Sequence, residues 1–224
     1  ENEIVVTAGV QESIALAMLS LLETGDEVLI TSPRFTTYDL NVRMCNAKPI
    51  PIPTYEKNNF SLMPEIIENK INERTKVIVL VSPNNPTGAV TPPENIKKIA
   101  EIAIKHNLIV IADEIYADLI YENHQHLSIG TLENMKERTL TLNGFSKTYA
   151  MTGWRIGYIA GPEDIIKKMS EIRHSLSINS CTFSQFGALA ALEGPQDDII
   201  RMKDEYNIRR KFCMKALNDI GFSY

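Results

Sequence analysis

The residues best suited to chemistry lie at positions 143–158, which read NGFSKTYAMTGWRIGY. Lys147 stands between two hydroxyl residues, and Arg155 follows eight positions later. A lysine that forms a Schiff base must be neutral part of the time, and crowding together with a neighbouring cation favours the neutral amine. The planar fork of an arginine matches the oxygens of a phosphate. An amine for an aldehyde and a guanidinium for a phosphate together indicate pyridoxal phosphate.

Two further segments place polar groups next to apolar runs. Residues 7–13, TAGVQES, open a helical pattern, and free backbone N–H groups at a helix start suit a phosphate. Residues 82–88, SPNNPTG, form a proline-bounded loop that is rigid enough to hold a side-chain amide in place. Asn85-Pro86 is a candidate cis peptide bond. The plainer alternatives are a simple turn for the first segment and an ordinary loop for the second.

A third segment, residues 112–116, reads ADEIY and ends an apolar run. A carboxylate at the end of such a strand is partly desolvated and needs a partner, which makes Asp113 a candidate site residue. A protonated pyridine nitrogen would be a partner, and the ion pair would keep the ring cationic, so that it acts as an electron sink. Tyr116 could reach the same ring. The plainer alternative for Asp113 is a helix N-cap.

The elements that must position these groups alternate along the chain. Helical spacing occurs at residues 10–22, 38–45, 64–73, 93–106, 162–173, 183–192 and 197–220, and strand-like apolar runs occur at 27–31, 48–52, 76–81, 108–112 and 138–142. Continuously apolar strands are expected where helices cover both faces of a parallel sheet. We therefore predict an α/β fold with a three-layer, mostly parallel sheet. Its strand carboxyl ends should bind the ligand.

Composition narrows the class of protein. Hydrophobic residues make up 44% of the 224 residues, which is enough for a sizeable core. A net charge of −5 without a basic run argues against a nucleic-acid partner. The cysteines and histidines form no metal-ligand spacing, so we expect no metal. Scattered thiols and the lack of a membrane-length apolar run favour a cytoplasmic protein with no membrane partner.

Together the four segments resemble the fold-type I pyridoxal-phosphate enzymes, specifically the class I and II aminotransferases. The similarity rests on residues 82–88, 112–116 and 146–158, in the order and spacing of that family, and it extends over essentially the whole chain. It implies the large domain of a pyridoxal-phosphate-dependent transferase. It also implies amino-group transfer between an amino acid and a 2-oxo acid, and a homodimer.

The resemblance assigns the catalytic roles. Lys147 should carry the Schiff base with the cofactor and then move a proton between Cα and C4′. Asp113 should bind the pyridine nitrogen. Asn85 and Tyr116 should hydrogen-bond the phenolic oxygen of the cofactor.

The remaining cofactor contacts also follow from the resemblance. Arg155 should bind the phosphate, helped by the backbone N–H groups of Val10 and Gln11. Phe35 falls where the family stacks an aromatic ring on the cofactor, an arrangement worth about 0.5–1.5 kcal/mol beyond area burial. The alternative for Phe35 is core packing.

One position departs from the family pattern. Many relatives have a hydroxyl residue three positions before the lysine, where it touches the phosphate, but this chain has Gly144. Ser146 is the nearest substitute in the sequence, and we include it among the cofactor-binding residues.

By the same resemblance, residues 1–215 should form the cofactor-binding large domain, and residues 216–224 should begin a small domain. The arginine that clamps the substrate carboxylate would lie beyond residue 224. A substrate-gating segment, and a tyrosine lent to the neighbouring subunit, would lie before residue 1. Both ends of the sequence would then be cut points.

Three alternatives stay open. A carbon–sulfur β-lyase would use the same cofactor contacts. A non-catalytic relative would keep the fold for binding or regulation, although the intact Lys147, Asp113 and Arg155 argue against it. A large-domain fragment would bind the cofactor and turn over poorly. Arg34 and Arg43 are unassigned charges, so these residues identify no particular amino acid.

Overall fold

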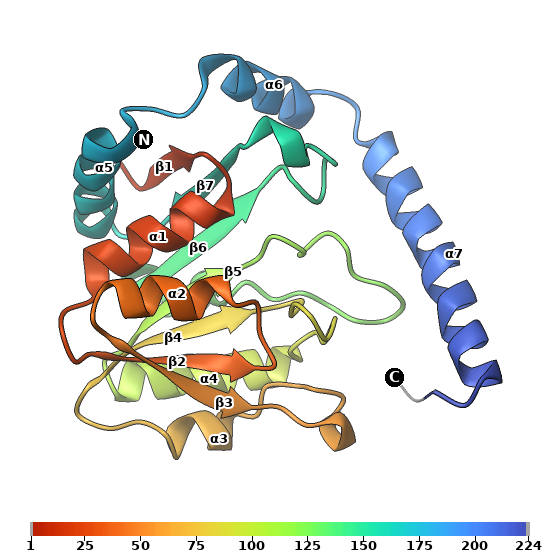
Figure 1. Ribbon diagram of the computed structural model, residues 1–224, viewed down its shortest axis with the longest axis horizontal. Helices are drawn as coiled ribbons and strands as arrows, with labels where there is room; N and C mark the ends of the chain where they lie inside the picture. Colours follow the sequence, from red (N-terminus) through yellow and green to blue (C-terminus); the bar gives the residue numbers. More distant parts are fainter. Residues whose placement is uncertain (1, 223–224) are drawn as a thin grey trace.

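The computed structural model describes residues 2–222 and contains a seven-stranded sheet (Figure 1). Its strands are β1 (Ile4–Thr7), β2 (Glu27–Ser32), β3 (Lys48–Pro53), β4 (Thr75–Val81), β5 (Ile109–Asp113), β6 (Thr139–Gly144) and β7 (Gly157–Ala160). Their order across the sheet is β1-β7-β6-β5-β4-β2-β3. Within this sheet β7 alone runs against its neighbours, β1 and β6. The predicted mostly parallel sheet is therefore confirmed.

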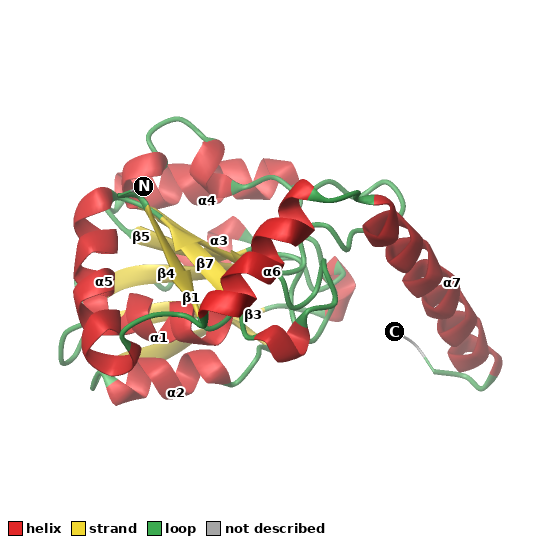
Figure 2. Cartoon of the chain, turned by 90° about the horizontal axis from the view of Figure 1, so that it is seen from above, coloured by secondary structure: helices red, strands yellow, loops and turns green. Residues whose placement is uncertain are grey.

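Helices cover both faces of the sheet. They are α1 (Val10–Leu21), α2 (Thr37–Met44), α3 (Pro64–Glu68), α4 (Pro93–Lys105), α5 (Glu163–Ser177), α6 (Thr182–Glu193) and α7 (Asp197–Asp219). Helices α1, α2 and α5 lie on one face and α3 and α4 on the other, which gives the expected three layers (Figures 1 and 2). Within residues 2–222, no helix combines the length and apolar character needed to cross a membrane.

Alternating side chains of the central strands fill the two layers. In β4, Val77 and Val79 pack in the cluster that includes α1, α2 and α5. Ile78 and Leu80 pack in the cluster that includes α3 and α4. A strand buried on both faces needs an apolar residue at nearly every position, which is why residues 77–81 are all apolar.

The helix expected at residues 64–73 is shorter than predicted, because α3 ends at Glu68. The Oδ1 atom of Asn72 accepts the Arg74 N–H at 2.9 Å, and the Asn72 N–H donates to Oγ1 of Thr75 at 3.0 Å. Asparagine side chains that bond the backbone locally compete with helical hydrogen bonds. This turn redirects the chain into β4.

Helix α7 stands apart from the sheet (Figures 1 and 2) and contains no buried residue. Nη2 of Arg210 donates to Oε1 of Glu122 at 2.6 Å, and the guanidinium lies 5.1 Å from the ring centroid of Tyr121. These contacts tie α7 to the loop that follows β5. The expected domain boundary between residues 215 and 216 lies inside this continuous helix. Residues 1, 223 and 224, which belong to the two expected domains, lie outside the described residues.

Candidate functional site

A cavity of about 260 Å³ lies at the carboxyl ends of β1, β2, β4, β5 and β6. In Figure 1 the arrowheads of β2 and β4 point to this edge of the sheet. The nine predicted site residues all line the cavity: Val10, Gln11, Phe35, Asn85, Asp113, Tyr116, Ser146, Lys147 and Arg155. Since pockets for drug-sized ligands span about 300–1,000 Å³, a cavity of this size suits a compact ligand with one ring.

Lys147 reaches the cavity from the loop after β6 and is half-buried. Its Nζ lies 5.6 Å from the ring centroid of Tyr116, and within residues 2–222 the amine has no carboxylate partner within ion-pair distance. The next residue, Thr148, donates its hydroxyl to Oδ2 of Asp118 at 2.9 Å, which anchors the loop. The backbone is thus held while the amine stays available to an electrophile.

Asp113 ends β5 and is 6% exposed. Its Oδ1 accepts the Ile115 N–H at 3.1 Å, and its Oδ2 accepts a short hydrogen bond from the hydroxyl of Tyr38. Burial raises the pKa of Asp113 above its ordinary value, and the two hydrogen bonds oppose that rise. The chain continues after Asp113 as turns, so the helix N-cap alternative is wrong.

The Arg155 guanidinium lies beside the start of α1. Its Nη2 donates to Ala8 O at 3.3 Å and its Nη1 to Thr152 O at 2.9 Å. Gly9 makes this approach possible, because a Cβ at this position would lie only 2.6 Å from Nη2. The free N–H groups of a helix start and an arginine fork together form a cradle for an anion such as a phosphate.

Two loops frame the cavity from the β2 and β4 strand ends. Phe35 lines the cavity and is 43% exposed, so the core-packing alternative is wrong. The Asn85-Pro86 bond is cis, as predicted. Nδ2 of Asn84 donates to Oγ1 of Thr87 at 2.9 Å and to Pro33 O at 3.4 Å, which ties the Asn85 loop to the Phe35 loop.

The structure gives a physical reason for Gly144. A Cβ at this position would lie 3.0 Å from the Cα of Gly157 and 3.1 Å from the carbonyl oxygen of Ile156, so β7 would have to move to accommodate one. A side chain at position 144 would therefore crowd the backbone of this neighbouring strand. Ser146 lines the cavity and remains the candidate substitute.

Sequence reasoning missed Tyr38, which lines the cavity. Its partner Asp113 is 75 positions away, and neither spacing nor pattern links residues so far apart. The sequence does show a tyrosine near the start of a predicted helix. If that tyrosine is buried, its hydroxyl needs a hydrogen-bond partner, and this was the available signal. Arg34, an unassigned charge, pairs with Asp39 at 2.5 Å and is therefore already neutralised.

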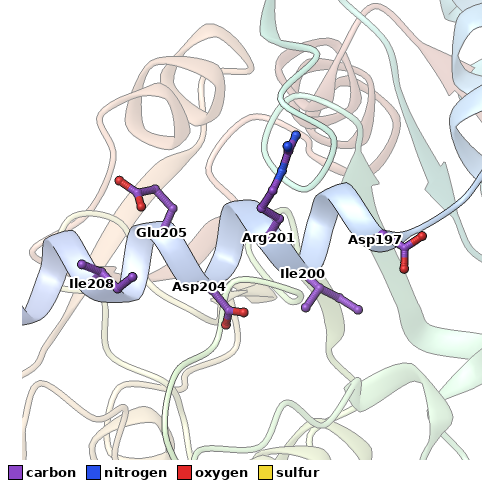
Figure 3. A pocket seen from close by; sticks show the side chains of 6 residues that line it. All are labelled: Asp197, Ile200, Arg201, Asp204, Glu205 and Ile208. Atoms are coloured by element: carbon purple, nitrogen blue, oxygen red, sulfur yellow. The ribbon is translucent and has the colours of Figure 1, made fainter.

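A second, shallow hollow of about 420 Å³ runs along α7 (Figure 3). All its lining residues belong to that one helix: Asp197, Ile200, Arg201, Asp204, Glu205 and Ile208. Arg201 pairs with Asp198 of the same helix at 2.8 Å. The hollow includes none of the predicted site residues, so the sheet-edge cavity is the candidate site. No cluster of three or more metal-ligating side chains occurs within residues 2–222.

The chain matches the family described as "Aminotransferase class I and II" along residues 1–224. It is 41% identical over 222 residues to an aspartate aminotransferase of Pyrococcus abyssi. The matched region makes up 98% of this chain and 57% of that protein. It is 38% identical over 223 residues to aromatic-amino-acid aminotransferase 2 of Thermococcus litoralis. This matched region makes up 99% of this chain and 57% of that protein.

The solved structure of an aromatic aminotransferase from Pyrococcus horikoshii has a TM-score of 0.97 at 38% identity, covering 99% of this chain and 60% of that one. The chain therefore spans less than two thirds of the length of these relatives. With a family match along all 224 residues and relatives above 30% identity, the chain belongs to the class I and II aminotransferase family.

Proposed function

We propose that this chain is the cofactor-binding part of a pyridoxal-phosphate-dependent aminotransferase that moves an amino group from an amino acid to a 2-oxo acid. The observation that carries the proposal is the meeting of Lys147, Asp113 and Arg155 around one cavity. An unpaired amine, a buried carboxylate and a guanidinium beside a helix start fit a ligand with an aldehyde, a ring nitrogen and a phosphate.

The residues present would hold this cofactor as follows. Lys147 would attach it covalently through its amine; once the substrate amine had displaced that bond, the freed Lys147 amine would move a proton between the substrate Cα and C4′. Asp113 keeps the ring nitrogen protonated. Asn85 and Tyr116 hydrogen-bond the phenolic oxygen. When bound, the cofactor supplies the electron sink for negative charge at Cα.

The phosphate and the ring face have their own contacts. Arg155 and the N–H groups of Val10 and Gln11 bind the phosphate, with Ser146 as an added hydroxyl. Phe35 covers one face of the ring, and its exposed position beside the cavity supports that role.

We further propose that residues 1–215 form the large domain, that residues 216–224 begin a second domain, and that the protein is a cytoplasmic homodimer. The exposed aromatic residues of α6 support a contact between subunits, since Phe183 is 72% and Phe186 is 69% exposed.

The test is an absorbance spectrum of the chain with added pyridoxal phosphate. We expect a band of lysine-linked cofactor that disappears in Lys147→Ala. It should persist in Lys136→Ala, a matched control whose side chain is 76% exposed and pairs with Glu3. No band in the native chain, or a band that persists in Lys147→Ala, would contradict the proposal.

Substrate chemistry is tested next with the same sample. Added glutamate or aspartate should convert the cofactor to its amine form and shift the band. Release of pyruvate and sulfide from cystathionine would indicate the carbon–sulfur lyase instead. A cofactor band that no amino acid changes would fit either a non-catalytic binding domain or a large-domain fragment that turns over poorly.

A further inference from the structure

Tyr38 links the wall of the cavity to the carboxylate of Asp113. It is the second residue of α2, is 1% exposed, and belongs to the apolar cluster between the sheet and α1, α2 and α5. Its hydroxyl donates to Oδ2 of Asp113, which is itself 6% exposed. Both partners also line the cavity, so this hydrogen bond lies at the edge of the candidate site.

The Asp113 carboxylate is held by two separate elements. A carboxylate offers about four acceptor positions on its two oxygens. The Tyr38 hydroxyl, from α2, occupies one of them on Oδ2, and the Ile115 N–H, from the turn after β5, occupies one on Oδ1 at 3.1 Å. Two donors on different oxygens fix the rotation of the carboxylate. The remaining acceptor positions are available to a donor in the cavity.

Without the Tyr38 hydroxyl, only the hydrogen bond from the Ile115 N–H would oppose the groups that disfavour a charged Asp113. Burial raises the pKa of Asp113, and the nearby Glu114 adds to that rise. The Tyr38 hydrogen bond lowers this pKa. Burial and the charge of Asp113 raise the pKa of Tyr38 well above its ordinary value, with a smaller contribution from Tyr116, so the phenol stays a donor. The cations Lys147 and Arg155 line the same cavity.

We propose that Tyr38 is a positioning residue of the cofactor site, which holds Asp113 as an oriented anion and thereby sets how firmly a ring nitrogen in the cavity keeps its proton. The part concerning the ring nitrogen rests on the proposed function, whereas the part concerning Asp113 does not. Without the hydroxyl, the Asp113 anion would be less stabilised and would hold a protonated ring nitrogen less firmly.

The first experiment needs no cofactor. Tyr38→Phe keeps the ring and its packing but removes the donor. In protein labelled with ¹³C at the aspartate carboxyl carbons, we expect the Asp113 titration midpoint to move to higher pH in Tyr38→Phe. Tyr149→Phe is the control, because its hydroxyl bonds Gln196 at 3.2 Å and does not touch Asp113. An unchanged Asp113 midpoint in Tyr38→Phe overturns the proposal.

A 3-fluorotyrosine at position 38 covers the case in which Tyr38→Phe does not fold. Fluorine makes the phenol a stronger donor at nearly the same size, so the Asp113 midpoint should move to lower pH. A shift to higher pH, or none, in this variant contradicts the proposal independently of the phenylalanine variant.

The second experiment measures pyridoxal phosphate affinity and the pH dependence of its absorbance band. We expect about tenfold weaker binding in Tyr38→Phe, the size expected for losing one charge-assisted hydrogen bond, and a shifted pH midpoint of the band. In an Asp113→Asn background, Tyr38→Phe should have no further effect, because Tyr38 acts through that carboxylate. An equal loss in both backgrounds would mean that Tyr38 acts by packing. Failure of native protein to bind would sink the proposed function but leave the first experiment valid.

Discussion

The sheet-edge cavity and helix α7 use their residues in opposite ways. The cavity collects side chains from segments far apart in sequence, and they stand on strands whose residues, such as Ile111 and Leu142, are fully buried. Helix α7 has 23 consecutive residues, none of which is buried, and leaves Phe212 72% exposed. The comparison shows that the geometry of the site is set by the buried sheet beneath it.

The largest difference between the regions should appear in stability. Ile111→Ala removes a fully buried side chain from β5, and we expect a loss of about 2–5 kcal/mol in the free energy of unfolding, because a cavity remains. The matched change Ile208→Ala, on α7, concerns a side chain that is 64% exposed, and its effect should stay within about 0.5 kcal/mol. Urea unfolding measures both. Similar losses would show that α7 is packed as tightly as the sheet.

Two glycines with the same backbone angle sharpen the comparison. Gly9, before α1, and Gly221, after α7, both have φ near +85°. Gly9 has ψ 167°, a region that is essentially restricted to glycine, so Gly9→Ala should cost about 1–3 kcal/mol. Its Cβ would also displace the Arg155 guanidinium, so we expect cofactor affinity to fall by about tenfold or more.

Gly221→Ala is the control for backbone strain. Among the described residues other than its two chain neighbours, no heavy atom lies within 4 Å of the point that a Cβ on Gly221 would occupy. This change should therefore cost about 1 kcal/mol and leave cofactor affinity unchanged. Urea unfolding and a cofactor titration followed by absorbance measure the two effects. Equal affinities in the two variants would show that the clearance at Gly9 has no role in binding.

Much of this contrast could be predicted from the sequence. Strands β4 and β5 are apolar at most positions, and polar residues of the cavity follow their carboxyl ends, so the run that ends at Asp113 predicts both a strand and a candidate site residue. The residues after β6 carry Lys147 in the same way. Lys147, Arg155 and Asp113 can be picked out from the residues themselves, whereas the expectation for Val10, Gln11 and Phe35 depends on the family resemblance.

The rest depends on contacts between distant segments. The hydrogen bond between Tyr38 and Asp113 forms because α2 packs in the layer beside α1, where Tyr38 reaches the end of β5. The reversed direction of β7 depends on pairing with β1 across most of the chain. The close approach of Gly157 to Gly144 is likewise a tertiary contact. Helical pattern alone predicts α7, but a pattern does not show whether a face is buried.

The smallest expected effect is on the pH dependence of the free energy of unfolding, which should have opposite signs for a carboxylate in the cavity and one beside α7. Burial raises the pKa of Asp113 above its ordinary 3.8, so the folded state binds this proton more readily than the unfolded state. Its contribution to stability therefore falls as the pH rises through that raised pKa, and it stays unfavourable at neutral pH. Asp113→Asn removes the charge but keeps the shape. Without cofactor at pH 7, we expect a gain of about 1 kcal/mol, which shrinks toward pH 4.

Glu122, which anchors α7, should behave in the opposite way. Its hydrogen bond to Arg210 lowers its pKa from 4.5, so its contribution is present at neutral pH and is lost as the pH falls through the lowered pKa. Glu122→Gln should therefore bring no gain in stability at pH 7. Urea midpoints of both variants and the native chain at pH 4–8 test the pair. A lower free energy of unfolding for Asp113→Asn at pH 7 would show that the Asp113 carboxylate stabilises the fold without cofactor. The expectation that this charge destabilises the folded chain would then be wrong.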